Sequence, residues 1–307
     1  MASDVDKRVR TASGDLGGEG TLESLRLKLR AGELGTLPFV IQNLLQMLSN
    51  PNSSAKHLGQ VVATDQALSA AVLRLANSAY YGFSQKVSDV KQAVTLIGYG
   101  SLRELVMSIT SYDLIFKHGG MVFDRQELWN HGLSVACAAR VLARHTRQIP
   151  GEVVFVAGIL HEIGFTLIDQ HAHNLFVKIV SHARKLGQSI VTVERDLMGV
   201  THADVGMWAA QAWNLPPVLQ SAIRYHHDPF RAGEWVLPAA IVAMADLLCR
   251  DPYTIEREQV EQIRVLADYL RLTKHDQTQV LLATHDEMKH VSSFLGVATN
   301  ASSASAG

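Results

Sequence analysis

Along most of this chain, apolar residues recur at intervals of three and four, the spacing of one face of an α-helix. Two such faces consist of Leu68, Ala71, Val72 and Leu75, and of Val90, Ala93, Val94 and Ile97. Asp65 stands where an N-cap of the first helix belongs, while Ser88 and Gly98 mark the start and the end of the second. Strict alternation of apolar and polar residues is scarce, so the pattern predicts helices and not strands.

Capping residues and helix breakers divide the remainder into further helices. One helix is predicted to begin near Asp124, where Asp-Arg-Gln-Glu has the spacing of a capping box, and to run to about Leu142. Pro150 opens the next helical segment, and Gly164 is expected to interrupt it. Later stops are predicted at Gly187, at Pro216 with Pro217, and at Pro229. The predicted fold class is all-α.

Composition and charge narrow the class of protein. Of 307 residues, 47% are hydrophobic and 19% charged, which is a globular balance, and the net charge of −1 gives no concentrated basic face for nucleic acid. Cys137 and Cys249 lie in apolar helical patterns and support no disulfide framework. The N-terminus lacks a signal-peptide pattern, and the longest apolar run, residues 153–160, is far short of the ~20 residues that span a bilayer. We therefore expect a soluble, cytoplasmic protein without membrane partners.

A series of histidines and acidic residues is the most informative chemical feature. In chain order it consists of Glu127, His131, His161, Glu162, His202, His226, His227 and Asp246. Several of these sit within apolar helical patterns, where an unpaired carboxylate or histidine costs several kcal/mol to bury, of order 2–7 kcal/mol. A metal ion would remove that cost, and mixed imidazole and carboxylate ligands suit Fe, Mn or Zn.

Each of these residues, taken alone, also has a purely structural explanation. Glu127 fits the role of cap partner of Asp124, and His131 and His202 fit core histidines bonded to the backbone. The pair His226 and His227 fits a helix end. The metal hypothesis therefore depends on the ordered set and not on any single member.

The ordered set resembles a known superfamily. His161-Glu-Ile-Gly looks like the HD motif, commonly His-Asp-Ile-Gly-Lys, and the flanking histidines and the late Ala-Asp follow the order of the HD-GYP cyclic-dinucleotide phosphodiesterases. The resemblance implies a first metal site at His131, His161, Glu162 and Asp246, extended by His202, His226, His227 and Glu127.

A second resemblance is sharper and covers about residues 34–231. Leu-Pro-Phe-Val, then Ala-Thr-Asp-Gln-Ala-Leu-Ser-Ala-Ala-Val-Leu-Arg-Leu-Ala-Asn-Ser, and later Trp-Asn-Leu-Pro-Pro, resemble HDOD domains. Gln66 stands where that family usually has proline, and Asn77 with Ser78 is explained by helix capping. The resemblance implies an HD-like domain with an N-terminal helical subdomain at 34–231. Composition adds a C-terminal helical segment at 232–297 and disordered tails at 1–20 and 298–307.

Three departures from the HD-GYP pattern weaken a catalytic reading. Glu162 replaces the bridging aspartate, and its extra methylene moves the carboxylate by on the order of 1.5 Å. Phe165 replaces the lysine that would meet a substrate phosphate, and no Gly-Tyr-Pro loop follows His227.

Two function hypotheses follow. The first is a non-catalytic signal-transduction protein that acts through protein contacts on an HD-like scaffold, with a protein partner in a signalling pathway and no assigned catalytic or cofactor-binding residues. The HD-GYP resemblance also admits partners from cyclic-dinucleotide signalling. The alternative is a metal-dependent phosphodiesterase acting on a nucleotide or cyclic dinucleotide. In either case we expect at least one transition-metal ion, held by His131, His161, Glu162 and Asp246.

Overall fold

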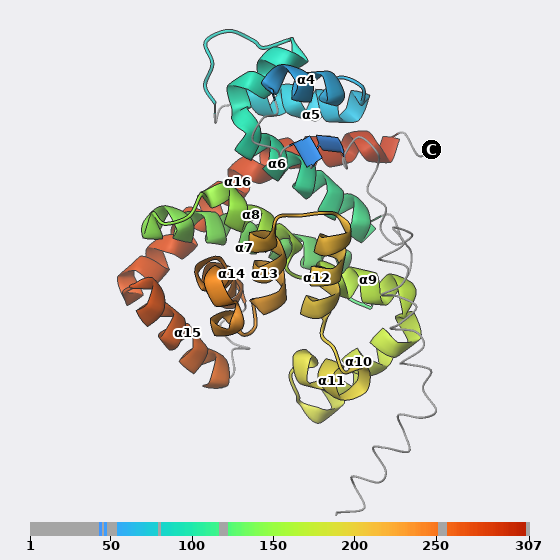
Figure 1. Ribbon diagram of the computed structural model, residues 1–307, viewed down its shortest axis with the longest axis vertical. Coiled ribbons are helices and arrows are strands. Elements are labelled where there is room, and N and C mark those ends of the chain that lie inside the picture. The colour runs from blue at the N-terminus through green and yellow to red at the C-terminus, as the bar shows by residue number, and fades with distance from the viewer. Residues whose placement is uncertain are drawn as a thin grey trace, which may run out of the picture.

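The computed structural model consists of packed α-helices (Figure 1). It describes residues 43, 44, 46, 47, 54–78, 81–116, 122–250 and 257–304. Within the last of these ranges, side chains are described for 258–289 and for Val291. No strand occurs within these ranges. The all-α prediction is confirmed.

The helices α4 (Ala55–Val62) and α5 (Gln66–Ala76) lie at one end of the molecule, and α6 (Val90–Phe116) runs from there toward the centre (Figure 1). Asp65 caps α5 as predicted, since its side chain accepts from the backbone N–H of Leu68, and the apolar face of α5 is buried. Gly98 breaks the helical path within α6 with φ 77° and ψ 171°, which is the predicted stop, after which the chain turns into a second helical run.

Asn77 and Ser78 cap the C-terminal end of α5. The Asn77 amide donates to the carbonyls of Leu73 and Val87 and its oxygen accepts from the N–H of Val87. Asn77 does this with φ −88°, so it is a bridging cap and not the left-handed residue that its type would allow.

The centre of the molecule is made by three consecutive helices, α7 (Arg125–Thr146), α8 (Gly151–Leu160) and α9 (Ile163–His171). The Asp124 side chain caps α7 by accepting from two backbone N–H groups, and Pro150 precedes α8. The predicted interruption at Gly164 is wrong, because Gly164 lies inside α9 and the chain breaks at His161 and Glu162 instead. A Cβ on Gly164 would lie 1.9 Å from the carbonyl oxygen of His202, so this glycine serves close helix packing.

The remaining helices surround this centre. They are α10 (His173–Leu186), α11 (Ile190–Met198), α12 (His202–Ala212), α13 (Pro217–Tyr225), the short 3₁₀ helices η1 (Pro229–Arg231) and η2 (Gly233–Trp235), α14 (Val236–Cys249), α15 (Arg257–Leu270) and α16 (Lys274–Ala304). Gly187 ends α10 with φ 61°, and the predicted boundaries at Pro217 and Pro229 coincide with helix starts.

The stretch Gly151–His171, which joins α8 and α9, is long and apolar enough to cross a membrane by length and composition. The sequence predicted no membrane span here, because the longest continuous apolar run covers only residues 153–160. In the fold, 78% of its most apolar window is buried inside the protein, which is the position of a core helix.

The long helix α16 packs against α5, α6 and α7 and so spans both halves of the molecule (Figure 1). Glu287 on α16 pairs with Arg144 and, at 2.6 Å, with Arg140, whose guanidinium also binds Glu104 on α6 at 2.8 Å. α14 likewise packs against α7 and α8, so helices beyond residue 231 complete the core.

The predicted boundaries at 34–231 and 232–297 stay predictions. The tail predicted at residues 1–20 lies outside the described residues. The helix α16 continues to Ala304, into the segment 298–307 for which a tail was predicted, and alanine at positions 298, 301 and 304 has the highest helix propensity.

Candidate metal centre

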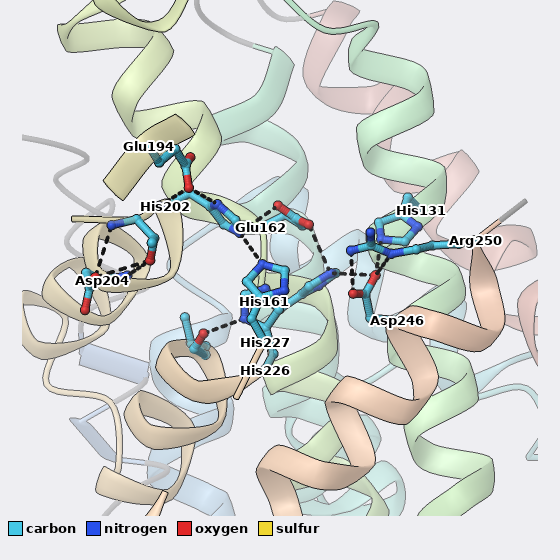
Figure 2. Close-up of polar contacts among 12 residues, drawn as sticks. His131, His161, Glu162, Glu194, His202, Asp204, His226, His227, Asp246 and Arg250 are labelled. Atoms are coloured by element: carbon cyan, nitrogen blue, oxygen red, sulfur yellow. Dashed lines mark hydrogen bonds and ion pairs between the residues drawn. The ribbon is translucent and has the colours of Figure 1, made fainter. Parts of the chain in front are cut away.

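Seven of the eight predicted site residues converge at the centre of the fold, in two neighbouring groups (Figure 2). Within each group, one candidate ligand atom from every residue lies within 4.8 Å of the others. The first group is His131, His161, Glu162 and Asp246, and the second is His202, His226 and His227. The eighth, Glu127, is exposed in the first turn of α7 and belongs to neither group, although its spacing from His131 places both on one helix face.

Helix ends deliver most of these side chains. His161 is the C-cap of α8 and Glu162 the N-cap of α9, so the break between two apolar helices turns both side chains toward the centre. His202 begins α12, and His226 is the C-cap of α13. His131 and Asp246 come from within α7 and α14, which pack against each other. The contact of Gly164 with the start of α12 holds the Glu162 and His202 segments close together.

In the first group, Asp246 is the most heavily bonded residue. His131 Nε2 lies 3.1 Å from its Oδ1, and Arg250 donates from Nε to Oδ1 at 3.2 Å and from Nη2 to Oδ2 at 2.7 Å. Burial works to raise the pKa of Asp246, but the His131 hydrogen bond and the Arg250 charge outweigh it and hold that pKa well below its usual value. Asp246 is therefore a carboxylate in this site.

His161 is bonded on one side alone. Its Nδ1 lies 2.7 Å from the carbonyl oxygen of Gly158, so Nδ1 carries the proton and donates. Its Nε2 is buried without a hydrogen-bond partner, 3.7 Å from Glu162 Oε1 and 3.9 Å from Asp246 Oδ1. Burial holds the pKa of His161 well below its usual value, so the ring is neutral and Nε2 presents a lone pair.

The second group repeats this arrangement. His226 Nδ1 donates to the carbonyl of Ile223 at 2.7 Å, its Nε2 is buried without a partner, and burial lowers its pKa to about 3. His202 Nδ1 lies 2.8 Å from the buried carboxylate of Glu194, while its Nε2 faces His227 Nε2 at 3.0 Å. A histidine oriented by a carboxylate or carbonyl on one nitrogen, with the other nitrogen facing a common centre, is the usual arrangement of metal-binding imidazoles.

Glu162 lies between the two groups (Figure 2). One oxygen faces His161 at 3.7 Å and the other faces His202 at 3.5 Å, and Oε2 is buried without a hydrogen-bond partner. The unpartnered atoms of His161, Glu162 and His226 all belong to nitrogen and carboxylate groups that bind transition metals. The residues present therefore fit a metal ion, which would satisfy atoms that the protein leaves unpaired.

Phe165 covers one side of this cluster. Its ring stacks on the imidazole of His202 with centroids 3.8 Å apart and an interplanar angle of 25°, and it contacts Phe123 and Phe176 on its other sides. The Phe165 side chain is buried. At the position where HD enzymes have a lysine, this protein thus has an apolar ring packed onto a candidate ligand.

A cleft of about 930 Å³ opens beside the cluster. Its walls come from α10 and α11 on one side and α14 and α15 on the other, and include Arg184, Arg195 and Glu258. His131, Glu162, His202 and His227 also line it, so the cleft connects the cluster with the outside.

Two residues of the site were not predicted from the sequence. Glu194 stands in an ordinary amphipathic helix and gives no local signal of its contact with His202. Arg250 follows Asp246 by four residues, and this helical spacing is a local signal of their contact.

Comparisons with known proteins identify the family. A model of the HDOD domain matches residues 34–229. An uncharacterised protein of Treponema pallidum is 25% identical over 258 residues, which are 83% of this chain and 49% of that protein, so the chain spans about half the length of this relative.

Solved structures share the fold. A crystal structure from Shewanella amazonensis, provisionally named a phosphohydrolase, matches with a TM-score of 0.70 and 27% identity over 88% of this chain and 97% of that one. Another, from Marinobacter aquaeolei and provisionally named a signal transduction protein, matches with a TM-score of 0.66 and 21% identity over 91% of this chain and 66% of that one. On the match that covers 34–229, this chain belongs to the HDOD domain family.

Proposed function

We propose that this protein is a non-catalytic signal-transduction component of the cytoplasm, which acts through protein contacts and uses the HD-like centre as a scaffold. The stacking of Phe165 on His202 carries this proposal. A phosphodiesterase needs a cation where charge develops on the phosphate, and here that position holds a buried apolar ring. Loss of one such charge-stabilising group typically costs ~10²–10³ in rate.

A second difference adds to the first. Glu162 carries one methylene more than the aspartate of the HD motif and lies between the two ligand groups at 3.7 and 3.5 Å from their nearest imidazole nitrogens. A displaced bridging carboxylate would misplace the attacking hydroxide, and misplacement by about 1 Å can cost ~10² in rate. The two losses need not multiply simply, because coupled groups do not add.

We further propose that a transition-metal ion, Fe, Mn or Zn, stabilises the fold by occupying the cluster. A bound ion supplies positive charge and coordination in a cluster where His161 Nε2, Glu162 Oε2 and His226 Nε2 lack hydrogen-bond partners. The support for this is the donor set itself, because a buried carboxylate and two neutral imidazoles without partners are costly to keep in a core.

The partner-binding surface is proposed to lie on the N-terminal half, residues 34–116. In its described part, Phe83 and Leu96 are large apolar side chains exposed at 39% each, and Phe83 stacks on Tyr81. The Marinobacter relative, named a signal transduction protein, supports the signalling role. The net charge of −1 favours a protein partner over nucleic acid.

A second candidate function is a metal-dependent phosphodiesterase. The cleft of about 930 Å³ favours it, since Arg184 and Arg195 line that cleft together with the cluster and guanidinium groups suit phosphate. The name of the Shewanella relative points the same way. The two candidates differ in one measurable quantity, turnover of a phosphodiester.

A hydrolysis assay separates them. The natural chain and the double variant Glu162→Asp, Phe165→Lys are loaded with Mn or Fe and given a cyclic dinucleotide and a generic phosphodiester. We expect no turnover by the natural chain above the metal-only blank. Robust turnover that His161→Ala abolishes, with the circular dichroism spectrum and melting temperature unchanged, would make this protein an enzyme.

The partner surface is tested with Leu96→Ser and the matched control Val177→Ser, whose side chain is exposed to a similar extent, 42%, on α10. Binding of an identified signalling partner should weaken with the first change and persist with the second. Equal weakening by both, or by the control alone, would place the surface elsewhere.

A further inference from the structure

The carboxylate of Asp246 is already paired with a cation of this chain (Figure 2). The Arg250 guanidinium binds it through two nitrogens, at 3.2 Å to Oδ1 and 2.7 Å to Oδ2, and His131 Nε2 lies 3.1 Å from Oδ1. Paired contacts of this kind are the strong form of the arginine–carboxylate interaction. Both oxygens through which Asp246 would bind a metal ion are thus engaged.

In the second group, the imidazole nitrogens face one another. His226 is 1% exposed and its Nε2 has no hydrogen-bond partner, while its Nδ1 is spent on a backbone carbonyl. His202 and His227 face each other through Nε2 atoms at 3.0 Å, and Glu162 Oε2 lies 3.5 Å from His202. Three imidazoles therefore meet at this position, with the Glu162 carboxylate next to one of them, and three histidines that leave a fourth position open are a known ligand set for a tetrahedral ion.

Arg250 also opposes a second ion by its charge. Its guanidinium binds both oxygens of Asp246, so a divalent ion on that carboxylate would lie beside a fixed positive charge. Two positive charges at such close range in a buried site repel each other strongly. The cluster therefore favours a single ion, placed away from Asp246.

We infer that this protein holds a single divalent transition-metal ion, on His202, His226 and His227 with Glu162 beside them, and that Arg250 takes the place of a second ion at Asp246. This placement differs from the expectation drawn from the HD resemblance, in which His131, His161, Glu162 and Asp246 hold the ion. It rests on the proposed metal-supported scaffold and specifies where the ion lies and how many are held. Once Arg250 is removed, a second ion can bind to Asp246 and to the unpartnered Nε2 of His161.

The experiment counts ions. The metal-free full chain is titrated with Co²⁺, whose visible absorption reports tetrahedral coordination, and the bound metal is then measured by elemental analysis after equilibrium dialysis. We expect one ion per chain for the natural protein and two for Arg250→Gln. The matched control Arg195→Gln removes an exposed arginine from the same cleft and should leave the count at one.

Two ligand variants locate the ion. His226→Ala should lower the affinity of the natural chain for Co²⁺ at least 10-fold, whereas Asp246→Asn should leave one ion bound. Two ions in the natural chain, one ion in Arg250→Gln, or the loss of the ion in Asp246→Asn with retention in His226→Ala would each overturn the inference. Zero ions would overturn it as well and would leave the signalling proposal standing, because that proposal is decided by turnover and partner binding.

Discussion

Gly164→Ala should separate two helices that the site needs in contact. A Cβ at this position would lie 1.9 Å from the carbonyl oxygen of His202, 2.7 Å from its carbonyl carbon and 3.0 Å from the backbone nitrogen of Gly206. All three contacts are backbone atoms, so no side-chain rotation relieves them. Restoring an ordinary contact of 3.4 Å requires a shift of about 1.5 Å between α9 and α12.

The cost follows from that shift. Overpacking a well-packed core typically lowers the free energy of unfolding by about 1–3 kcal/mol when side chains can shift. Because the clash here is with backbone atoms, we expect a loss of about 3 kcal/mol or more. For a domain of this size the melting temperature should fall by about 6–12 °C. Because α12 begins at His202, the same shift should also weaken Co²⁺ binding.

Gly132→Ala is the matched control. Gly132 is also a helical glycine, on α7 beside α8, but a Cβ there would lie 3.6 Å from its nearest neighbour, the carbonyl oxygen of Ile159. Alanine should therefore be neutral or stabilising by up to about 1 kcal/mol. Urea denaturation of both variants measures the difference. If Gly164→Ala proved as stable as Gly132→Ala, the close approach of α9 to α12 would be refuted.

Three further outcomes are expected. Burial raises the pKa of Glu104 from 4.5 to about 7, so the folded chain holds this proton more tightly than the unfolded chain does. Stability from this group is full below pH 4.5 and is lost as the pH rises through 7, by up to about 3 kcal/mol, and Glu104→Gln should remove that slope in denaturation series between pH 4.5 and 7.5. Asn77→Ala removes the side-chain bonds to Val87 and should lower the free energy of unfolding by about 1–3 kcal/mol, whereas Asn77→Asp, which keeps the bond from the Val87 N–H, should lose less. A change of equal size in the two variants would contradict that account. Glu194→Gln loses the carboxylate that orients His202 and should weaken Zn²⁺ binding about 10–100-fold in a competition titration; unchanged affinity would show that Glu194 does not position this ligand.

Local patterns were enough to predict the all-α class and several helix boundaries of this fold. Asp65 and Asp124 cap the helices that they were expected to cap, and Gly98 and Gly187 lie at the predicted breaks. Gly164 misled because glycine has two uses, as a helix breaker and as a residue that allows close packing. Only the position of α12, distant in sequence, decides between them.

The site was predictable as a set of residue types and not as a geometry. The order of histidines and carboxylates predicted a cluster, and seven of its members do meet. Sequence spacing does not determine side-chain directions at helix ends. These directions decide which imidazole nitrogens donate to backbone carbonyls and whether Arg250 pairs with Asp246. Glu127 shows the same limit, since it shares a helix face with His131 and yet stays in solvent.

The distance along the chain between the site's members also sets when it can form. His131 and Asp246 are separated by 115 positions, and the Arg140–Glu287 ion pair closes a loop of 147. Contacts of such sequence separation form after local helices, because loop closure must come first. During synthesis, the Asp246 group stays incomplete until α14 has emerged and packed on α7. The ligands proposed for the ion, Glu162, His202, His226 and His227, lie closer together along the chain and all precede α14. Metal uptake can therefore come before α14 packs, and the Arg250–Asp246 pair is then the part of the centre that forms last.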